Sequence, residues 1–309
     1  MNERHPGGGV VGGPVLVGVD ESESALDAVR WAAAEAALRH APLRLVAVFT
    51  PVPPGHIGNP GLGTAYRRQV AKAARAVLDT AVALAGEVAP RVRTEAELRE
   101  GFPVPVLLTE SDRAQLTVVG SRGLGGFSGL LVGSVAVALA ARGGSPVVVV
   151  RGDRAEPAAT AEPDPRPVVV GVDGSPLSEA AVGLAFEEAA LRSAPLLAVH
   201  TWLDDMLEPA LAPMIDWSAL ETEEHVLLAE RLAGWSEKYP DVEIRRLVER
   251  DRPARALIAG STGAQLVVVG SRGRGGAAGL LLGSVSHALL HHAHCPVLVT
   301  RPHGGEETP

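Results

Sequence analysis

Two copies of one glycine-rich stretch hold the residues best suited to chemistry. The stretch runs from Gly120 to Val135 and returns from Gly270 to Val285, and the copies differ at four of sixteen positions. Each copy follows a short β-branched apolar run and leads into an apolar helical pattern. Glycines let backbone N–H groups approach an oxyanion closely, and a helix N-terminus adds unpaired donors and a positive dipole end. The order strand, glycine loop, helix therefore predicts a phosphate site, with a purely structural turn as the alternative.

The spacing common to both copies is Gly-x2-Gly-x9-Gly-Ser. No lysine follows the third glycine, so this is not a Walker loop. The second copy matches a loose dinucleotide fingerprint from Gly273 to Ala278, but the first copy has Ser128 at the last position and follows a late strand. We expect the phosphates to be held by the loop residues, which are Gly120, Ser121, Arg122, Gly123, Gly133, Ser134 and Val135 in the first copy and Gly270, Ser271, Arg272, Gly273, Gly283, Ser284 and Val285 in the second.

Polar side chains in and near the loops could add to this site. The hydroxyls of Ser134 and Ser284 could cap the following helix or bond a phosphate oxygen. The arginines of the two loops could pair with polyphosphate, or they could be ordinary surface charges. Asp20 and Asp173 each follow a first strand, where a carboxylate could face a nucleotide or simply cap a helix.

In this duplicated spacing the chain resembles the universal stress protein family, in the tandem form of its ATP-binding branch, over nearly its whole length. The resemblance implies that the aspartates contact ribose hydroxyls or help to hold Mg²⁺. It also implies that the adenine ring meets main-chain groups of the second strands. The further binding residues expected on the first and second strands are Gly18, Val46, Gly171 and Ala198.

The elements that position these residues also repeat. The run from Val15 to Asp20 returns from Val168 to Asp173, and each unit alternates strands with helices, which predicts an α/β fold with a parallel sheet covered on both faces. In the first unit we expect strands at 15–19, 43–49, 92–98, 116–119 and 146–150, and helices at 24–40, 69–86, 103–111 and 134–141. Such sheets bind ligands at the carboxyl ends of their strands, where the aspartates and loops lie.

The domain plan follows from this repeat. We expect a disordered tail over residues 1–13, domains over 14–151 and 167–301, a linker over 152–166 and a short tail over 302–309. Each domain is predicted as a doubly wound, Rossmann-like module with a five-stranded sheet. The family resemblance implies that the domains pair through their last strands as a pseudo-dimer. The loops 51–66 and 203–220 differ most between the units and could act as lids or partner surfaces.

Composition limits the partners and the compartment. The chain has 309 residues, a net charge of −8 and 3% aromatic residues, which argues against nucleic acid or an anionic membrane as the main partner. The one cysteine, Cys295, permits no intrachain disulfide and suits a cytoplasmic location. No apolar run approaches the length of a membrane span.

Three weaker features were weighed beside the loops. Histidines at 287, 291, 292 and 294 precede Cys295, but the first unit has no counterpart, so we favour a structural role over a metal site. The segment from His56 to Asn59 lacks the final histidine of a nucleotidyl transferase signature. Glu21 stands where the second unit has Gly174, and a second carboxylate near phosphates would weaken the first site.

The sequence therefore favours an ATP-binding regulatory protein of the stress response, with one nucleotide per domain and little or no turnover. It would act as a nucleotide-dependent switch or chaperone-like module on a protein partner, with homodimerisation open. A slow ATPase or phosphotransferase is the alternative, although no nucleophile–base pair is evident. A scaffold whose glycines only make turns is the third possibility.

Overall fold

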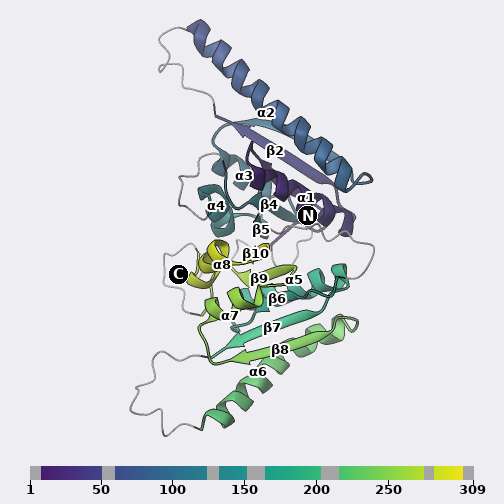
Figure 1. Cartoon of the computed structure of the whole chain (residues 1–309), viewed down its shortest axis with the longest axis vertical. Coiled ribbons are helices and arrows are strands. Elements are labelled where there is room, and N and C mark those ends of the chain that lie inside the picture. The colour runs from purple at the N-terminus through teal and green to yellow at the C-terminus, as the bar shows by residue number, and fades with distance from the viewer. Residues whose placement is uncertain are drawn as a thin grey trace. The chain divides into compact units, whose positions relative to one another are not determined.

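The computed structural model describes residues 8–50, 60–123, 132–151, 164–202, 216–274 and 282–301, with only the backbone for 60–62. The chain divides into two compact units, which are described separately here (Figure 1).

The first unit alternates strands and helices without interruption. Its elements are β1 (Val15–Val19), α1 (Glu23–Leu38), β2 (Leu43–Phe49), α2 (Pro60–Val88), β3 (Thr94–Glu100), α3 (Pro103–Ser111), β4 (Leu116–Gly120), α4 (Ser134–Arg142) and β5 (Val147–Val150). The strands pair in parallel in the order β3-β2-β1-β4-β5.

The second unit repeats this plan. Its elements are β6 (Val168–Gly171), α5 (Pro176–Arg192), β7 (Leu196–Thr201), α6 (Trp217–Lys238), β8 (Ile244–Glu249), α7 (Pro253–Gly260), β9 (Leu266–Gly270), α8 (Ser284–His292) and β10 (Val297–Thr300). The parallel strand order is β8-β7-β6-β9-β10. The predicted α/β fold with a five-stranded parallel sheet in each unit is confirmed.

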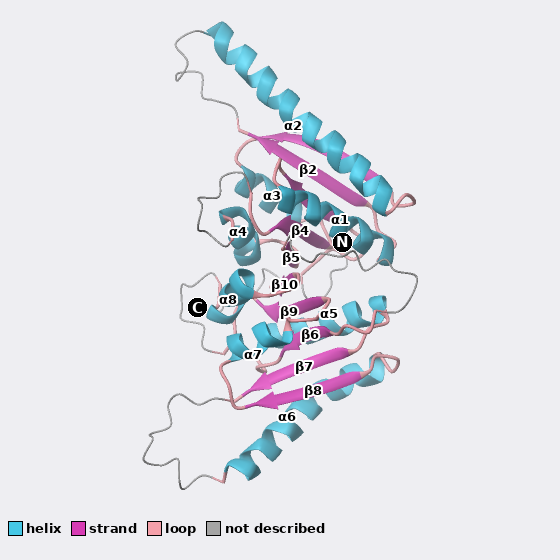
Figure 2. Ribbon diagram, viewed as in Figure 1, coloured by secondary structure: helices cyan, strands magenta, loops and turns pink. Residues whose placement is uncertain are grey.

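Helices cover both faces of each sheet (Figure 2). In the first unit α1 packs on β1 and β4 and touches α2, whereas α3 packs on β1 and β2 and touches α4. The central strand β1 is accordingly apolar, and every residue of β5 is buried. The chain order reverses between β1 and β4, and between β6 and β9. This reversal leaves a crevice at the carboxyl ends of those strands, which is where sheets of this kind bind ligands.

Serine caps fix the start of the first helix of each unit. The hydroxyl of Ser22 accepts from the amide of Ala25 at 3.2 Å, and that of Ser175 accepts from the amide of Ser178 at 3.2 Å. Pro176 follows the second cap, at a helix position that needs no N–H donor. The capping serines therefore lie two residues after Asp20 and Asp173, and each helix begins at the next residue.

The segments before the first strand of each unit are more ordered than predicted. Residues 8–13 fall in the expected tail, yet Val10 is buried and its amide donates to the carbonyl of Ala114 at 3.0 Å. The side-chain amide of Gln115 donates to the Gly13 carbonyl, and that of Gln265 donates to Arg166 at 2.7 Å. These two hydrogen bonds hold residue 13 and residue 166 against their units. The tail and the linker are therefore both shorter than predicted.

Some predicted element ends also shift. α2 begins at Pro60, so residues 60–66 are helical where a loop was expected, and α6 begins at Trp217, inside the second expected loop. The remaining parts of the two proposed lids lie outside the described residues. β3 lies two residues later than predicted. The predicted strands 15–19 and 43–49 and the helix 103–111 agree with β1, β2 and α3 residue for residue.

Candidate functional site

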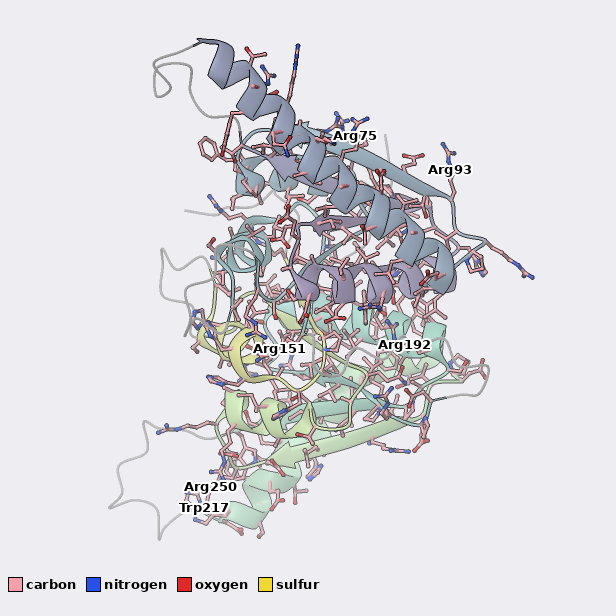
Figure 3. All side chains as sticks on the ribbon, turned by 45° about the horizontal axis from the view of Figure 1, so that its top comes forward. Arg75, Arg93, Arg151, Arg192, Trp217 and Arg250 are labelled. Atoms are coloured by element: carbon pink, nitrogen blue, oxygen red, sulfur yellow. The ribbon has the colours of Figure 1, made fainter. Side chains whose placement is uncertain are left out.

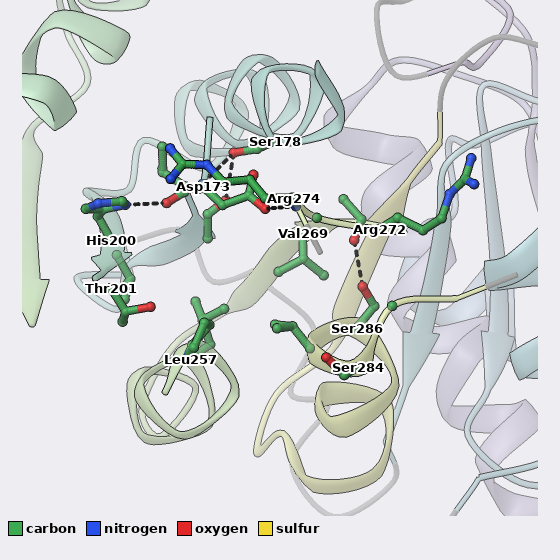
Figure 4. A pocket seen from close by; sticks show the side chains of 18 of the residues that line it. Asp173, Ser178, His200, Thr201, Leu257, Val269, Arg272, Arg274, Ser284 and Ser286 are labelled. Atoms are coloured by element: carbon green, nitrogen blue, oxygen red, sulfur yellow. Dashed lines mark hydrogen bonds between the residues drawn. The ribbon is translucent and has the colours of Figure 1, made fainter. Parts of the chain in front are cut away.

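Each unit has a cavity at the crevice between its first and fourth strands. The cavity of the first unit measures about 550 Å³ and that of the second about 590 Å³. Figure 4 shows the second cavity, with Ser284 and Ser286 of α8 across from His200 and Thr201 of β7. Both volumes fall in the range of sites for small organic ligands and cofactors.

Most of the predicted binding residues line these cavities. In the first unit they are Gly18, Asp20, Val46, Gly120, Arg122, Gly123, Gly133, Ser134 and Val135. In the second unit they are Gly171, Asp173, Gly270, Arg272, Gly273, Gly283, Ser284 and Val285. The structure therefore brings the loop residues next to first-strand residues that lie about a hundred positions earlier in the sequence.

A main-chain hydrogen bond closes each glycine loop at its base. The amide of Gly133 donates to the carbonyl of Ser121 at 2.7 Å, and Gly283 donates to Ser271 at the same distance. The amides of these serines donate in turn to the last strands, at Val150 and Thr300. Ser121 and Ser271 are buried and are not among the cavity-lining residues. They serve as anchors for the loop, and the residues between, 124–131 and 275–281, lie outside the described parts.

The helices α4 and α8 begin without a side-chain cap. Gly133 and Gly283 are the N-cap residues, so the expectation that Ser134 and Ser284 could cap the helix is wrong. Both serines are the first helical residues, and they are exposed. The cavity wall holds Ser134, Val135 and Ala136, whose amides lie in the helical turn that lacks intrahelical acceptors. Such a turn is a ready site for an anion.

Steric room differs sharply among the loop glycines. A Cβ added to Gly123 would lie 2.6 Å from Oδ2 of Asp20, and one added to Gly120 would lie 2.3 Å from the hydroxyl of Ser24. At Gly133 the nearest atom would be 3.6 Å away, which is ordinary contact. The packing therefore requires glycine at 120, where backbone atoms of Ser24 are close, whereas an added Cβ at Gly123 would displace the Asp20 carboxylate and one at Gly133 would fit.

The strand-ending aspartates hold the turn and the loop together. Oδ1 of Asp173 accepts from the amide of Ser175 at 2.9 Å, and Oδ2 accepts from the amide of Arg274 at 3.0 Å (Figure 4). Oδ1 of Asp20 accepts from the amide of Ser22 at 3.0 Å. Each aspartate thus forms a turn before the capping serine and also faces the cavity, so both interpretations of these residues apply.

Glu21 and Gly174, which occupy equivalent positions in the two units, are not among the residues that line the cavities. Glu21 is exposed and is not one of the described residues that line the first cavity. Gly174 has φ of +75°, and a Cβ there would lie 2.2 Å from the guanidinium of Arg231. The second unit therefore needs glycine at this position because an arginine packs over it.

The loop arginines contribute backbone to the cavity. Arg122 donates its amide to the hydroxyl of Ser24 at 3.1 Å, which fixes the loop on α1. In Figure 4 the side chain of Arg272 runs away from Asp173 and Ser284. The guanidinium in this conformation does not face the aspartate or the start of α8.

On β7 the residue that lines the cavity is one position later in the sequence than the predicted residue. Gly18 pairs with Val46 in the first unit, and Gly171 pairs with Val199 in the second. Val199 lines the second cavity, whereas Ala198, the predicted residue, is buried and does not line it. A slip of one residue along a strand moves a side chain to the opposite face of the sheet.

The second cavity contains a histidine–glutamate pair that the sequence analysis did not predict. Nδ1 of His200 lies 2.7 Å from the carbonyl oxygen of Val172, and Nε2 lies 2.8 Å from Oε2 of Glu224. The first unit has Ala47 and Ala74 at the equivalent positions. Only a comparison of the two repeats, which shows a histidine inside an otherwise apolar strand, could have indicated this pair.

An aromatic group borders the same cavity. Trp202 lines the cavity, and its ring lies 6.0 Å from that of Trp217 at the start of α6. The guanidinium carbon of Arg250 lies 3.8 Å from the centre of the Trp217 ring (Figure 3). Cation–π contact of this kind holds the end of β8 against α6.

The histidine-rich segment lies on α8. The rings of His287 and His291 are 4.5 Å apart, one helical turn from each other. Among the described residues no group of three or more His, Cys, Asp or Glu side chains could hold a metal ion. Cys295 is buried, and burial raises the pKa of its thiol to about 12. In the part of the chain that the structure describes, no helix is both long enough and apolar enough to cross a bilayer.

Comparisons with known proteins agree with this architecture. The model of the universal stress protein family matches residues 13–151 and again 165–301. A universal stress protein of Mycobacterium tuberculosis is 43% identical over 299 residues, which cover 93% of this chain and 96% of that protein. The crystal structure of a universal stress protein from Archaeoglobus fulgidus has the same fold, with a TM-score of 0.66, 20% identity and coverage of 96% of this chain and 98% of that one.

A solved universal stress protein in complex with cAMP is 29% identical to this chain, covers 46% of it and 98% of its own length, and has a TM-score of 0.34. Both halves of the chain match the family model, and the Mycobacterium tuberculosis relative aligns with almost the full length. The chain therefore belongs to the universal stress protein family and carries two of its domains in tandem.

Proposed function

We propose that the protein binds one molecule of ATP in the cavity of each unit and acts as a nucleotide-dependent switch in the stress response. The first-turn amides of α4 and α8 would hold the phosphates, and the base would lie toward Val46 and Val199 on the second strands. Nucleotide binding would change the surface that a regulatory protein partner recognises, with little or no turnover.

The observation that carries this proposal is the uncapped start of α4 and α8. Asn, Asp, Ser and Thr are the usual N-caps, because their side chains satisfy the amides of the first turn. Here glycine occupies both N-caps, and among the described residues no side chain caps either helix. The packing around Gly133 does not itself require glycine, since the nearest described atom to an added Cβ would be 3.6 Å away. A phosphate group would satisfy the amides.

Mg²⁺ fits the donors that the cavities offer. Mg²⁺ is commonly held by one or two carboxylates together with substrate phosphates. Each cavity has one such carboxylate at the strand end, Asp20 or Asp173, next to the glycine loop. A bound ion would offset the repulsion between this carboxylate and the phosphates.

Low turnover is consistent with the described side chains. His200 has both ring nitrogens engaged, by Val172 and by Glu224, so it has no vacant nitrogen to accept a proton from water. The histidine also lies across the cavity from the start of α8, where the phosphates would sit (Figure 4). In the first unit an alanine replaces it.

The proposal is tested by identifying and counting what the purified protein holds. The protein is denatured and the released small molecules are identified by mass spectrometry, and stripped protein is titrated with ATP and Mg²⁺ in a calorimeter. We expect an adenine nucleotide and two binding events per chain. Absence of binding at millimolar ATP would refute the proposal. Hydrolysis on the scale of about 1 per second would instead make the protein an ATPase.

A further inference from the structure

The long second helices of the two units have opposite charge. α2 carries Arg67, Arg68, Lys72 and Arg75 between residues 63 and 78, a stretch without Asp or Glu. α6 carries Glu221, Glu223, Glu224 and Glu230 between residues 217 and 230, a stretch without Lys or Arg. The two helices occupy the same place in their units, since each joins the second strand to the third. A basic helix is unexpected in a chain with a net charge of −8.

The basic residues of α2 form an exposed stripe. Arg68, Lys72 and Arg75 are spaced by four and three residues, which places them on one side of the helix. All three are exposed, and none has an ion pair within the described parts of the chain. Arg75 extends from the helix in Figure 3. Leu78 is the first buried residue among the described side chains of α2. The first half of this helix therefore packs little against the core of its own unit.

The acidic residues of α6 form a matching stripe. Glu223 and Glu230 are seven residues apart on one side of the helix and are exposed, whereas Glu221 is exposed on another side. No ion pair among the described residues involves these three, whereas Glu224 is taken by His200. Val226 lies between Glu223 and Glu230 on the same side of the helix and is 52% exposed.

Apolar side chains accompany the charges. Five large hydrophobic residues are exposed in the described parts of the chain, and three of them lie on these two helices: Tyr66, Val82 and Val226. Exposed ion pairs alone contribute little to association, and a charged surface is normally just solvated. A charged stripe beside exposed apolar side chains is instead typical of a protein interface, where apolar contact supplies affinity and charge supplies orientation.

We propose that the first half of α2 in one copy of the chain docks on the first half of α6 in a second copy. The arginine and lysine stripe faces Glu223 and Glu230, and the contact buries Val226, which lies between them. Every chain carries both helices, so each copy supplies both surfaces. A membrane or a nucleic acid would match the basic stripe but would leave the acidic stripe without a partner.

The test measures mass in solution as a function of protein concentration and salt, by sedimentation or light scattering. We expect a reversible association of the full chain whose dissociation constant rises by about tenfold between 50 and 500 mM NaCl, as screening predicts. The variant R68E/K72E/R75E makes the α2 stripe acidic, and the variant E223K/E230K makes the α6 stripe basic. Each variant alone should remain monomeric.

A mixture of the two variants should associate again, because the reversed α2 of one variant fits the reversed α6 of the other, and the two unreversed helices fit each other as in the wild type. This recovery also shows that neither variant is misfolded. The control R113E/R142E/R246E makes the same change in net charge at exposed arginines outside α2 and should associate like the wild type.

Four results would overturn the proposal: a wild type that stays monomeric at 50 mM NaCl, an association insensitive to the reversals, a mixture that stays monomeric, or an equal loss in the control. Binding of the wild type to vesicles containing phosphatidylserine, or to duplex DNA, without self-association would likewise overturn it.

Discussion

Replacing Gly133 with glutamate tests the phosphate cradle directly. The added Cβ would lie 3.6 Å from the carbonyl oxygen of Ser121 and 3.7 Å from the amide nitrogen of Gly123, in the open space between the two ends of the loop. The carboxylate would then occupy the cradle or its mouth, roughly 6 Å from a bound phosphate. Two unit charges at about 6 Å repel by about 3 kcal/mol at an effective dielectric constant of about 20. We therefore expect the affinity of the first site for ATP to fall by about a hundredfold.

Calorimetric titration of the stripped protein with ATP and Mg²⁺ measures this loss. The single variant should bind about one nucleotide per chain in place of two, and the double variant with Gly283→Glu should bind none. Gly133→Gln adds similar bulk without charge and should lose less affinity. Gly86→Glu is the matched control, because a Cβ there meets nothing within 4 Å and the residue is far along α2. If the folded double variant bound ATP as the wild type does, the helix starts would not be the phosphate site.

Three further predictions concern stability and reactivity. Gly120→Ala should lower the free energy of unfolding by about 1–3 kcal/mol in urea titrations, because its Cβ would lie 2.5 Å from the carbonyl oxygen of Ser24; an unchanged midpoint would contradict the close packing described. Glu224→Ala should cost about 1–3 kcal/mol by leaving Nε2 of the buried His200 without its partner, and Glu224→Gln, which keeps an acceptor, should cost less. The thiol of Cys295 should resist iodoacetamide at pH 8 in the native protein and react once unfolded, since burial raises its pKa from 9.0 to about 12. Because the folded protein holds this proton more tightly, the thiol's contribution to stability should decline as pH rises from about 9 toward 12, and replacement of the cysteine by alanine should remove that decline.

The alternation of strands and helices predicted the fold, and the duplicated glycine spacing placed most of its own residues at the cavities. Strand–loop–helix order determines where backbone amides gather, so Gly133 and Gly283 could be placed at the cavities without knowledge of any side-chain contact. The strands of the buried core were also readable, because β-branched runs bounded by Pro and Gly have few alternative structures.

Details that depend on register or on one unit alone could not be predicted. Ala198 and Val199 are both apolar, and only the pairing of Gly171 with Val199 decides which of them lines the cavity. The pair of His200 and Glu224 joins residues 24 positions apart on a strand and a helix. The starts of α2 and α6 fall in polar or proline-rich sequence, where local preference is weak and helix ends are read least reliably.

The hydrogen bond between Gly133 and Ser121, like the equivalent bond between Gly283 and Ser271, joins the two ends of each glycine loop. The position of the following helix therefore does not depend on the sequence of the loop between them. The start of the following helix lies on one side of this link, whereas the sequence between differs between the units, reading Leu-Gly-Gly-Phe-Ser after Gly123 and Arg-Gly-Gly-Ala-Ala after Gly273. Mutations in that stretch can therefore change its sequence while the link keeps the helix start in place. For protein engineering, the same link marks a point where a foreign peptide could be inserted into either unit.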